Sequence, residues 1–134
     1  MGLFAAVLAA QVGPAGAVEV VESSRRAVAD GRAALADLPQ VRFTPGRVED
    51  VLDRLPGPPG VVVADPPRRG LGRALVDAVA AAGPVRVLHV ACDPAALARD
   101  VALFTGHGYR LAGLRAFDAF PMTHHVECVA LLAR

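Results

Sequence analysis

Cys92 stands at a position that could support nucleophilic chemistry. It follows the apolar run 85–91 and precedes Asp93-Pro94, a good N-cap followed by a good first helical residue. A helix is therefore predicted to begin just after the thiol, and the positive end of a helix stabilises a thiolate. Free cysteines are more often buried core residues, so position alone leaves both roles open. Cys128, inside the last apolar run, is predicted to be a core residue.

A second segment with unusual chemistry, Asp65-Pro66-Pro67-Arg68-Arg69-Gly70, follows the apolar run 61–64. Two successive prolines remove two backbone donors and restrict the turn, so the loop is stiff and Asp65 is held in place. Rigid loops at strand ends are typical of active sites. A simple helix-capping turn would explain the aspartate and one proline, but not two prolines followed by two arginines.

Glu19 is the third candidate, predicted at the end of a short strand, 15–20. In nucleotide-binding sheets an acid at this place accepts hydrogen bonds from ribose hydroxyls. A solvated loop acid is an equally good interpretation. Glu22 competes for the role, but it is predicted to start the following helix, where a carboxylate favours the positive dipole end.

The elements that must position these residues alternate between strand and helix. Apolar runs predict strands at 15–20, 41–43, 61–64, 85–91, 109–117 and 125–132, and apolar stripes predict helices at 3–10, 22–38, 48–55, 71–82 and 94–104. The fully apolar run 61–64 is typical of a central parallel strand covered on both faces. The pattern predicts a doubly wound α/β sheet that closes with an antiparallel strand pair. Ligands of such sheets bind at the carboxyl ends of the strands.

Composition narrows the function classes. The chain has 134 residues, 54% of them hydrophobic, and a net charge of +1, which predicts one folded domain and argues against a strong electrostatic grip on nucleic acid. Two cysteines without close spacing suit neither a disulfide framework nor a zinc site, so a reducing cytoplasm is expected. The apolar stretch 1–18 lacks a preceding positive charge and is interrupted by glycine and proline. It is therefore predicted to be a core helix, not an export signal or a membrane span.

The four histidines predict no metal site. His124 and His125 are adjacent, which on a strand sends them to opposite faces, and His89 and His107 show no partner in the sequence.

Three motifs together carry a family resemblance. They are Asp65-Pro66-Pro67-Arg68, Ala91-Cys92-Asp93-Pro94 with Leu97-Ala98-Arg99-Asp100, and Phe120-Pro121-Met122-Thr123-His124-His125-Val126-Glu127. In order and spacing they resemble the signature motifs of the RNA 5-methyluridine methyltransferases, which use S-adenosylmethionine. The resemblance implies a Rossmann-like class I methyltransferase fold and methyl transfer to carbon 5 of a uridine in tRNA or rRNA.

The resemblance also implies a role for each matching residue. Cys92 would add to carbon 6 of the uracil, and Glu127 would remove the proton from carbon 5 after methyl transfer. Asp65 would close the cofactor and base pocket. The remaining implied contacts are Gly2, Leu3 and Glu19 to the cofactor, and Arg68 and Arg99, with Asp65, to the RNA.

Two departures from the family pattern matter. Asp93 stands where members often have asparagine, a mild change because both residues cap helices well. Of the family's first cofactor motif only Gly2-Leu3-Phe4 is present. Residues 1–134 are therefore expected to form a single, partial catalytic domain without the first strand of the sheet and without the RNA-binding module. Such a domain is expected to bind S-adenosylmethionine poorly by itself, and its oligomeric state stays open.

Two alternatives remain open. A cytosine-5 RNA methyltransferase shares the covalent chemistry, but it usually carries a second cysteine after the strand that here ends at Asp65, and this sequence has none there. A non-catalytic binding module of the same fold would keep the elements without cofactor affinity. Titration of the cofactor against the purified chain would separate it from an enzyme.

Overall fold

The computed structural model describes residues 2–119, 122–123 and 126–134. Met1 and four residues of the third motif, Phe120, Pro121, His124 and His125, lie outside the described residues. Contacts divide the chain into two compact units, Met1–Leu55 and Pro56–Arg134. The sequence predicts a single domain, and each unit is described below by itself.

The first unit is a small parallel sheet with helices. Strand β1 (Val18–Glu22) pairs in parallel with β2 (Val41–Pro45). The helices are α1 (Leu3–Val12), α2 (Arg25–Ala34) and the short α3 (Val48–Val51), which continues as the 3-10 turn η1 (Leu52–Arg54). Ala5 and Ala9 of α1 are buried against Val18 of β1. The apolar start of the chain thus forms a packed helix, as the sequence predicts.

Glycine is required at the beginning of α1. Gly2 has φ +100°, a left-handed conformation that L side chains rarely adopt, and a Cβ there would lie 3.1 Å from Leu35 Cδ1. The backbone therefore turns sharply into the helix and passes close to the side chain of Leu35.

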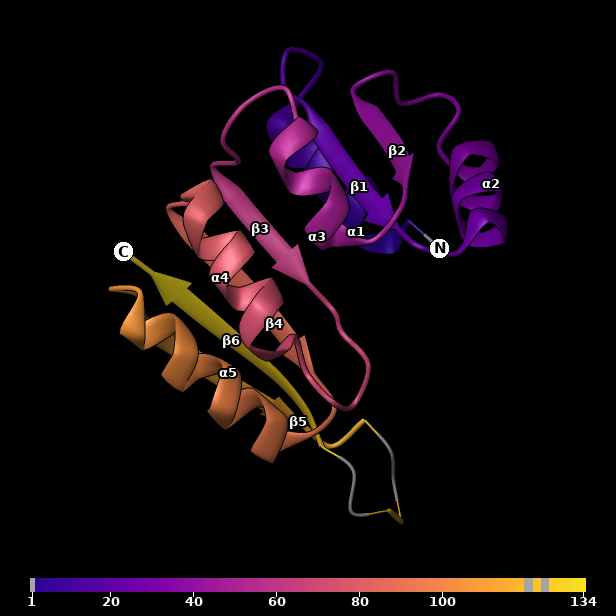
Figure 1. Ribbon diagram of the computed structural model, residues 1–134. Coiled ribbons are helices and arrows are strands. Elements are labelled where there is room, and N and C mark those ends of the chain that lie inside the picture. Colours follow the sequence, from indigo (N-terminus) through magenta and orange to yellow (C-terminus); the bar gives the residue numbers. More distant parts are fainter. Residues whose placement is uncertain (1, 120–121, 124–125) are drawn as a thin grey trace. The chain divides into compact units, whose positions relative to one another are not determined.

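The second unit is a mixed four-stranded sheet in the order β3-β4-β6-β5. Its elements are β3 (Val61–Ala64), α4 (Gly72–Ala82), β4 (Arg86–Ala91), α5 (Pro94–Gly106), β5 (Arg110–Phe117) and β6 (Glu127–Ala133). β3 and β4 run parallel, and β6 is antiparallel to both β4 and β5. Helices α4 and α5 lie side by side on one side of this sheet (Figure 1). The face of β4 that carries Val87, His89 and Ala91 is buried.

The predicted alternation of strands and helices and the closing antiparallel pair are confirmed. The described strands form two sheets, β1-β2 and β3-β4-β6-β5, which is consistent with a fold expected to lack its first strand. One expectation needs correction. The run Val61–Ala64 is an edge strand of its sheet rather than a central one, and Val61 is 52% exposed, because β3 pairs with β4 alone among the described strands.

No helix in the described ranges has both the length and the apolar character needed to span a membrane.

Candidate active site

The thiol and the carboxylate singled out by the sequence lie at the same end of the four-stranded sheet. Pairing of β4 with β6 sets Ala91 opposite Cys128, the last pair of these two strands. Cys92 follows Ala91, and Glu127 precedes Cys128 as the first residue of β6, where it pairs with Phe117 of β5. Both residues are half-buried, so both can meet a ligand at this end of the sheet.

The local sequence around Cys92 folds as predicted. Cys92 lies between the end of β4 and the start of α5. Asp93 is the N-cap of that helix, its Oδ1 accepts a hydrogen bond from the Ala96 N–H at 2.6 Å, and Pro94 occupies the first turn. Cys128 is buried in the core, 6% exposed, as expected. The thiol at Cys92 is therefore the accessible one of the pair.

Asp65 follows β3 directly and is exposed. Ala64 pairs in parallel with His89 of β4, so the loop 65–70 leaves the sheet at the same edge as Cys92 (Figure 1). The Gly70 N–H donates to the Pro67 oxygen at 2.8 Å and closes the turn. One end of the sheet in the second unit thus carries Asp65, Cys92 and Glu127.

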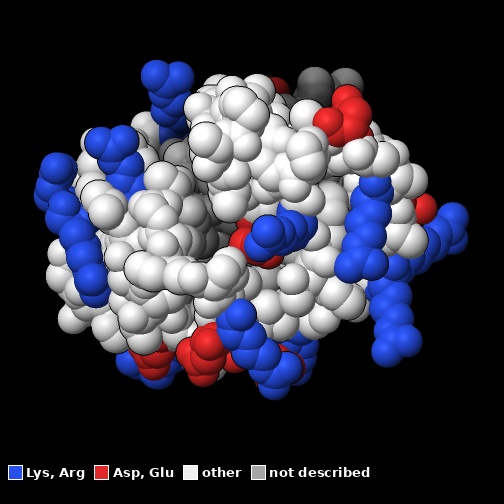
Figure 2. All heavy atoms as spheres, turned by 90° about the horizontal axis from the view of Figure 1, so that it is seen from above, with Lys and Arg blue, Asp and Glu red and all other residues white. Residues whose placement is uncertain are grey.

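Arg68 and Arg99 are both exposed side chains of the second unit. Arg68 belongs to the loop after β3, and Arg99 lies on α5. Figure 2 shows arginine side chains, in blue, at several places on one face, among uncharged side chains.

The first unit holds the other predicted cofactor residues, Gly2, Leu3 and Glu19. Leu3 is 77% exposed at the start of α1. Glu19 is the second residue of β1 and not its last, which corrects the predicted strand 15–20. The strand is shifted because Val18 to Glu22 pair residue by residue with the whole of β2.

The two competing acids of β1 have different surroundings. Glu19 lies 3.7 Å from the guanidinium of Arg42, and its side chain is 18% exposed. Glu22 ends the strand, and its carboxylate accepts a hydrogen bond from the Ser24 N–H at 2.7 Å. The reasons for preferring Glu19 are therefore wrong: Glu22 is the acid at the end of the strand, and it does not start the helix, because α2 begins at Arg25 after the N-cap Ser24.

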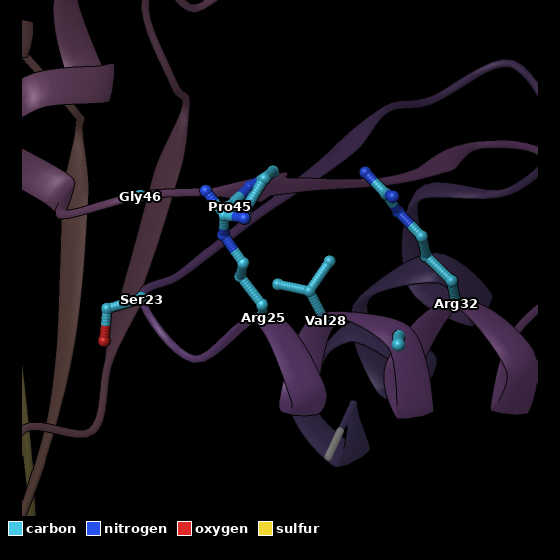
Figure 3. Close-up of a pocket in the computed structure, with 7 residues that line it drawn as sticks. Ser23, Arg25, Val28, Arg32, Pro45 and Gly46 are labelled. Atoms are coloured by element: carbon cyan, nitrogen blue, oxygen red, sulfur yellow. The ribbon is translucent and has the colours of Figure 1, made fainter.

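A pocket of about 460 Å³ that the sequence did not indicate lies in the first unit, at the carboxyl ends of β1 and β2. Figure 3 shows the side chain of Arg25 reaching toward Pro45 across it. Arg32 lines the same pocket, and its Nη2 donates to the Phe43 oxygen at 2.6 Å. Glu19 is not among the lining residues.

Two histidines that looked unpartnered in the sequence each contact an aspartate. His89 Nε2 lies 2.9 Å from Asp100 Oδ2 in the core, and His107 Nε2 lies 2.7 Å from Asp77 Oδ1 near the surface. The helical spacing carried a usable signal: Asp100 falls between Leu97 and Phe104 on the apolar stripe, and a buried aspartate needs a partner. Among the residues that the structure describes, no three His, Cys, Asp or Glu side chains gather as a metal site would require.

Known proteins share both the sequence and the fold. Residues 58–134 match the model of the family described as tRNA (Uracil-5-)-methyltransferase. The chain belongs to this family. A Streptomyces coelicolor protein named as an uncharacterized RNA methyltransferase is 52% identical over 133 residues, which cover 98% of this chain and 29% of that protein. A similarly named Streptomyces avermitilis protein is 50% identical over 137 residues, with coverages of 98% and 31%.

Solved structures of methyltransferases extend the comparison. The tRNA (uracil-54, C5)-methyltransferase of Pyrococcus abyssi, in complex with S-adenosyl-L-homocysteine, is 30% identical with a TM-score of 0.69, over 87% of this chain and 29% of that one. Fibrillarin of Aeropyrum pernix, 17% identical with a TM-score of 0.77 over 96% of this chain and 61% of that one, shares the fold. The Rossmann-like α/β fold is thus confirmed. The chain spans about a third of the length of the curated relatives it matches.

Proposed function

We propose that this chain belongs to an enzyme that transfers a methyl group from S-adenosylmethionine to carbon 5 of a uridine in RNA. The observation that carries the proposal is the pairing of β4 with β6, which brings Cys92 and Glu127 to the same end of the sheet. Addition to carbon 6 and removal of the proton from carbon 5 require a nucleophile and a base. Membership of the uracil-5 methyltransferase family supports the same reaction.

The residues of the first unit fit the cofactor. Gly2 has the left-handed conformation of a tight turn ahead of a helix, and the first N–H groups of α1 have no partner within the helix. Glu19 is a half-buried carboxylate whose ion pair with Arg42 is long and has an exposed partner, so its oxygens remain able to accept hydrogen bonds from hydroxyls. Within this unit, we assign the amino-acid end of the cofactor to Gly2 and Leu3, and the ribose to Glu19. When bound, S-adenosylmethionine supplies an electrophilic methyl group.

The reaction then depends on two side chains of the second unit. The Cys92 thiolate forms a bond from Sγ to carbon 6 of the uracil, and the electron pair of the 5,6 double bond makes carbon 5 nucleophilic. Carbon 5 takes up the methyl group. The Glu127 carboxylate accepts the proton from carbon 5, the double bond re-forms, and the bond between Sγ and carbon 6 breaks. The uridine leaves methylated and Cys92 returns to its starting state.

The RNA contacts follow from charge and exposure. Arg68 and Arg99 are exposed and belong to the loop after β3 and to α5, the two elements that flank Cys92. Each phosphate contact by an arginine releases counterions, so binding should weaken with salt in proportion to the number of contacts. A flipped uridine must reach the thiol, because carbon 6 is inaccessible within a stacked helix.

Release of tritium from RNA labelled at carbon 5 of uridine, assayed with the whole enzyme to which this chain belongs, tests the proposal. With S-adenosylmethionine present, tRNA or rRNA should lose tritium to water in step with methyl incorporation. No release from either RNA, with or without methyl incorporation elsewhere, contradicts the assignment. Absence of both cofactor binding and release would favour a non-catalytic binding module.

Glu127→Gln separates proton removal from the earlier steps. The amide cannot accept the proton, so turnover should fall while a covalent methylated intermediate accumulates on the protein. An unchanged rate of tritium release would leave Glu127 a structural residue. Glu49→Gln is the matched control, because that carboxylate pairs with Arg47 at 3.1 Å in the first unit and should not affect the reaction.

A further inference from the structure

A buried histidine and aspartate stand next to the proposed active site without a role in the reaction. His89 of β4 is fully buried, and Asp100 of α5 is 2% exposed. The carboxylate accepts three hydrogen bonds: Oδ2 from His89 Nε2 at 2.9 Å and from the Leu71 N–H at 2.7 Å, and Oδ1 from the Gly72 N–H at 3.0 Å. One carboxylate thus joins a strand, a helix and the backbone at the start of α4.

These contacts account for the burial of a charged group. A buried carboxylate is tolerated when it is paired and its oxygens accept hydrogen bonds. The second ring nitrogen of His89, Nδ1, lies 3.0 Å from the Val90 oxygen. Both ring nitrogens therefore lie within hydrogen-bond distance of an oxygen atom. The pair is a specific connection that an apolar pair of the same size would not make.

Along the chain, the two residues of this contact lie on either side of Cys92. His89 precedes Cys92 on β4, and Asp100 follows it on α5. The loop 65–70 ends against the same carboxylate: Gly70 has φ +79°, and a Cβ there would lie 2.5 Å from Asp100 Oδ2. The end of the loop that carries Asp65 is thereby fixed against the segment that carries the thiol.

We propose that Asp100 and His89 are positioning residues that hold the loop 65–70 at a fixed distance from Cys92. The inference rests on the proposed function, because it assigns the loop and the thiol to one reaction. Neither side chain touches the substrate in this account. They act by fixing the distance between the loop and the nucleophile, and small misplacements in active sites are costly.

Three substitutions test the connection. Asp100→Asn keeps the size of the side chain but points an N–H group at a backbone or ring donor. His89→Leu removes the donor to Asp100, and His89→Gln keeps an N–H donor near the place of Nε2. The matched control is Asp77→Asn, which alters the exposed pair between Asp77 on α4 and His107, the residue after α5.

Two readouts are compared for each variant: amide hydrogen exchange at Leu71 and Gly72, and the single-turnover rate of adduct formation with 5-fluorouridine RNA. Asp100→Asn and His89→Leu should raise exchange and slow adduct formation by about tenfold or more at saturating RNA, with the half-saturating RNA concentration unchanged. His89→Gln should restore both readouts, and Asp77→Asn should change neither. Normal exchange and rate in Asp100→Asn, or equal impairment in His89→Gln and His89→Leu, would overturn the proposal.

Failure of the proposed function has a different signature. If the unsubstituted protein forms no adduct, the reaction assignment is wrong. Amide exchange still tests whether the contact of His89 with Asp100 holds the loop 65–70. Unchanged exchange in Asp100→Asn refutes this role. Raised exchange in Asp100→Asn, together with normal exchange in His89→Gln, supports it.

Discussion

Substitution of Gly70 by alanine tests how tightly the loop before α4 is seated. Gly70 is buried and has φ +79°, and its missing side chain leaves room for the Asp100 carboxylate. An added Cβ would lie 2.5 Å from Asp100 Oδ2 and 3.3 Å from Ala96 Cβ. Asp100 cannot move away freely, because the same oxygen accepts hydrogen bonds from His89 and Leu71.

The expected loss of stability has two parts. A left-handed alanine costs about 1–2 kcal/mol, of which roughly 0.5–1 kcal/mol is offset because glycine loses more chain entropy on folding. Forcing an extra methyl group into a packed site costs about 1–3 kcal/mol more. Gly70→Ala should therefore lower the free energy of unfolding by about 2–4 kcal/mol.

Gly72→Ala is the matched control. Gly72 has φ +74°, nearly the same conformation, but nothing lies within 4 Å of its Cβ position. It should show only the conformational cost, about 1 kcal/mol. Urea titration monitored by circular dichroism measures both variants, and the difference between them isolates the steric cost.

Equal destabilisation by Gly70→Ala and Gly72→Ala would refute the close packing of Gly70 against the Asp100 carboxylate. A double-mutant cycle adds a second check: with Asp100→Ala in place, the extra cost of Gly70→Ala over Gly72→Ala should disappear. An undiminished extra cost would assign the clash to other atoms.

Substitutions at two further residues probe the second unit. Asp93→Ala removes the side-chain cap of α5 and should cost about 1 kcal/mol of stability in thermal unfolding, whereas Asp93→Asn should stay near the parent; equal losses would contradict the cap. Tyr109→Phe removes the buried hydrogen bond to the Pro84 oxygen at 2.7 Å and should cost about 1–2 kcal/mol. Burial raises the pKa of Tyr109 above its ordinary value of 10.0, so the unfolded chain releases the proton first and stability should fall as the pH rises above 10.0. Tyr109→Phe should reduce that alkaline loss, and an identical slope in both proteins would refute the assignment.

Local signals in the sequence predicted local structure well. The Asp93-Pro94 pair defined the start of α5 because an N-cap and a proline at the first turn act on the backbone within a few residues. The apolar burst after the third motif likewise predicted β6 and its buried Cys128. The order of strands and helices could therefore be read without knowledge of tertiary contacts.

Properties that depend on contacts between distant segments of the chain were less predictable. The run Val61–Ala64 is as apolar as a central strand, yet it lies at a sheet edge, since composition does not specify which strands pair. Glu19 shifted from the end of β1 to its second position because register with β2 defines the strand. The contact of His89 with Asp100 spans β4 and α5, and no spacing rule predicts a pair of that kind.

The same distinction between local and long-range properties holds for the candidate site. The types and order of Cys92 and Glu127 were evident in the sequence, but their place at one end of the sheet comes from the register of β4 and β6. That register is a long-range property, set by the antiparallel return of the last strand.

Covalent trapping tests the central claim, that Cys92 is the nucleophile of a uracil-5 methyltransferase. The protein is incubated with S-adenosylmethionine and RNA carrying 5-fluorouridine, in which fluorine cannot leave as the proton does, and the products are separated under denaturing conditions and mapped by mass spectrometry. The account predicts a stable adduct on the peptide that contains Cys92, present in Cys128→Ala and absent in Cys92→Ala. An adduct that persists in Cys92→Ala, or one mapped to Cys128, would contradict it.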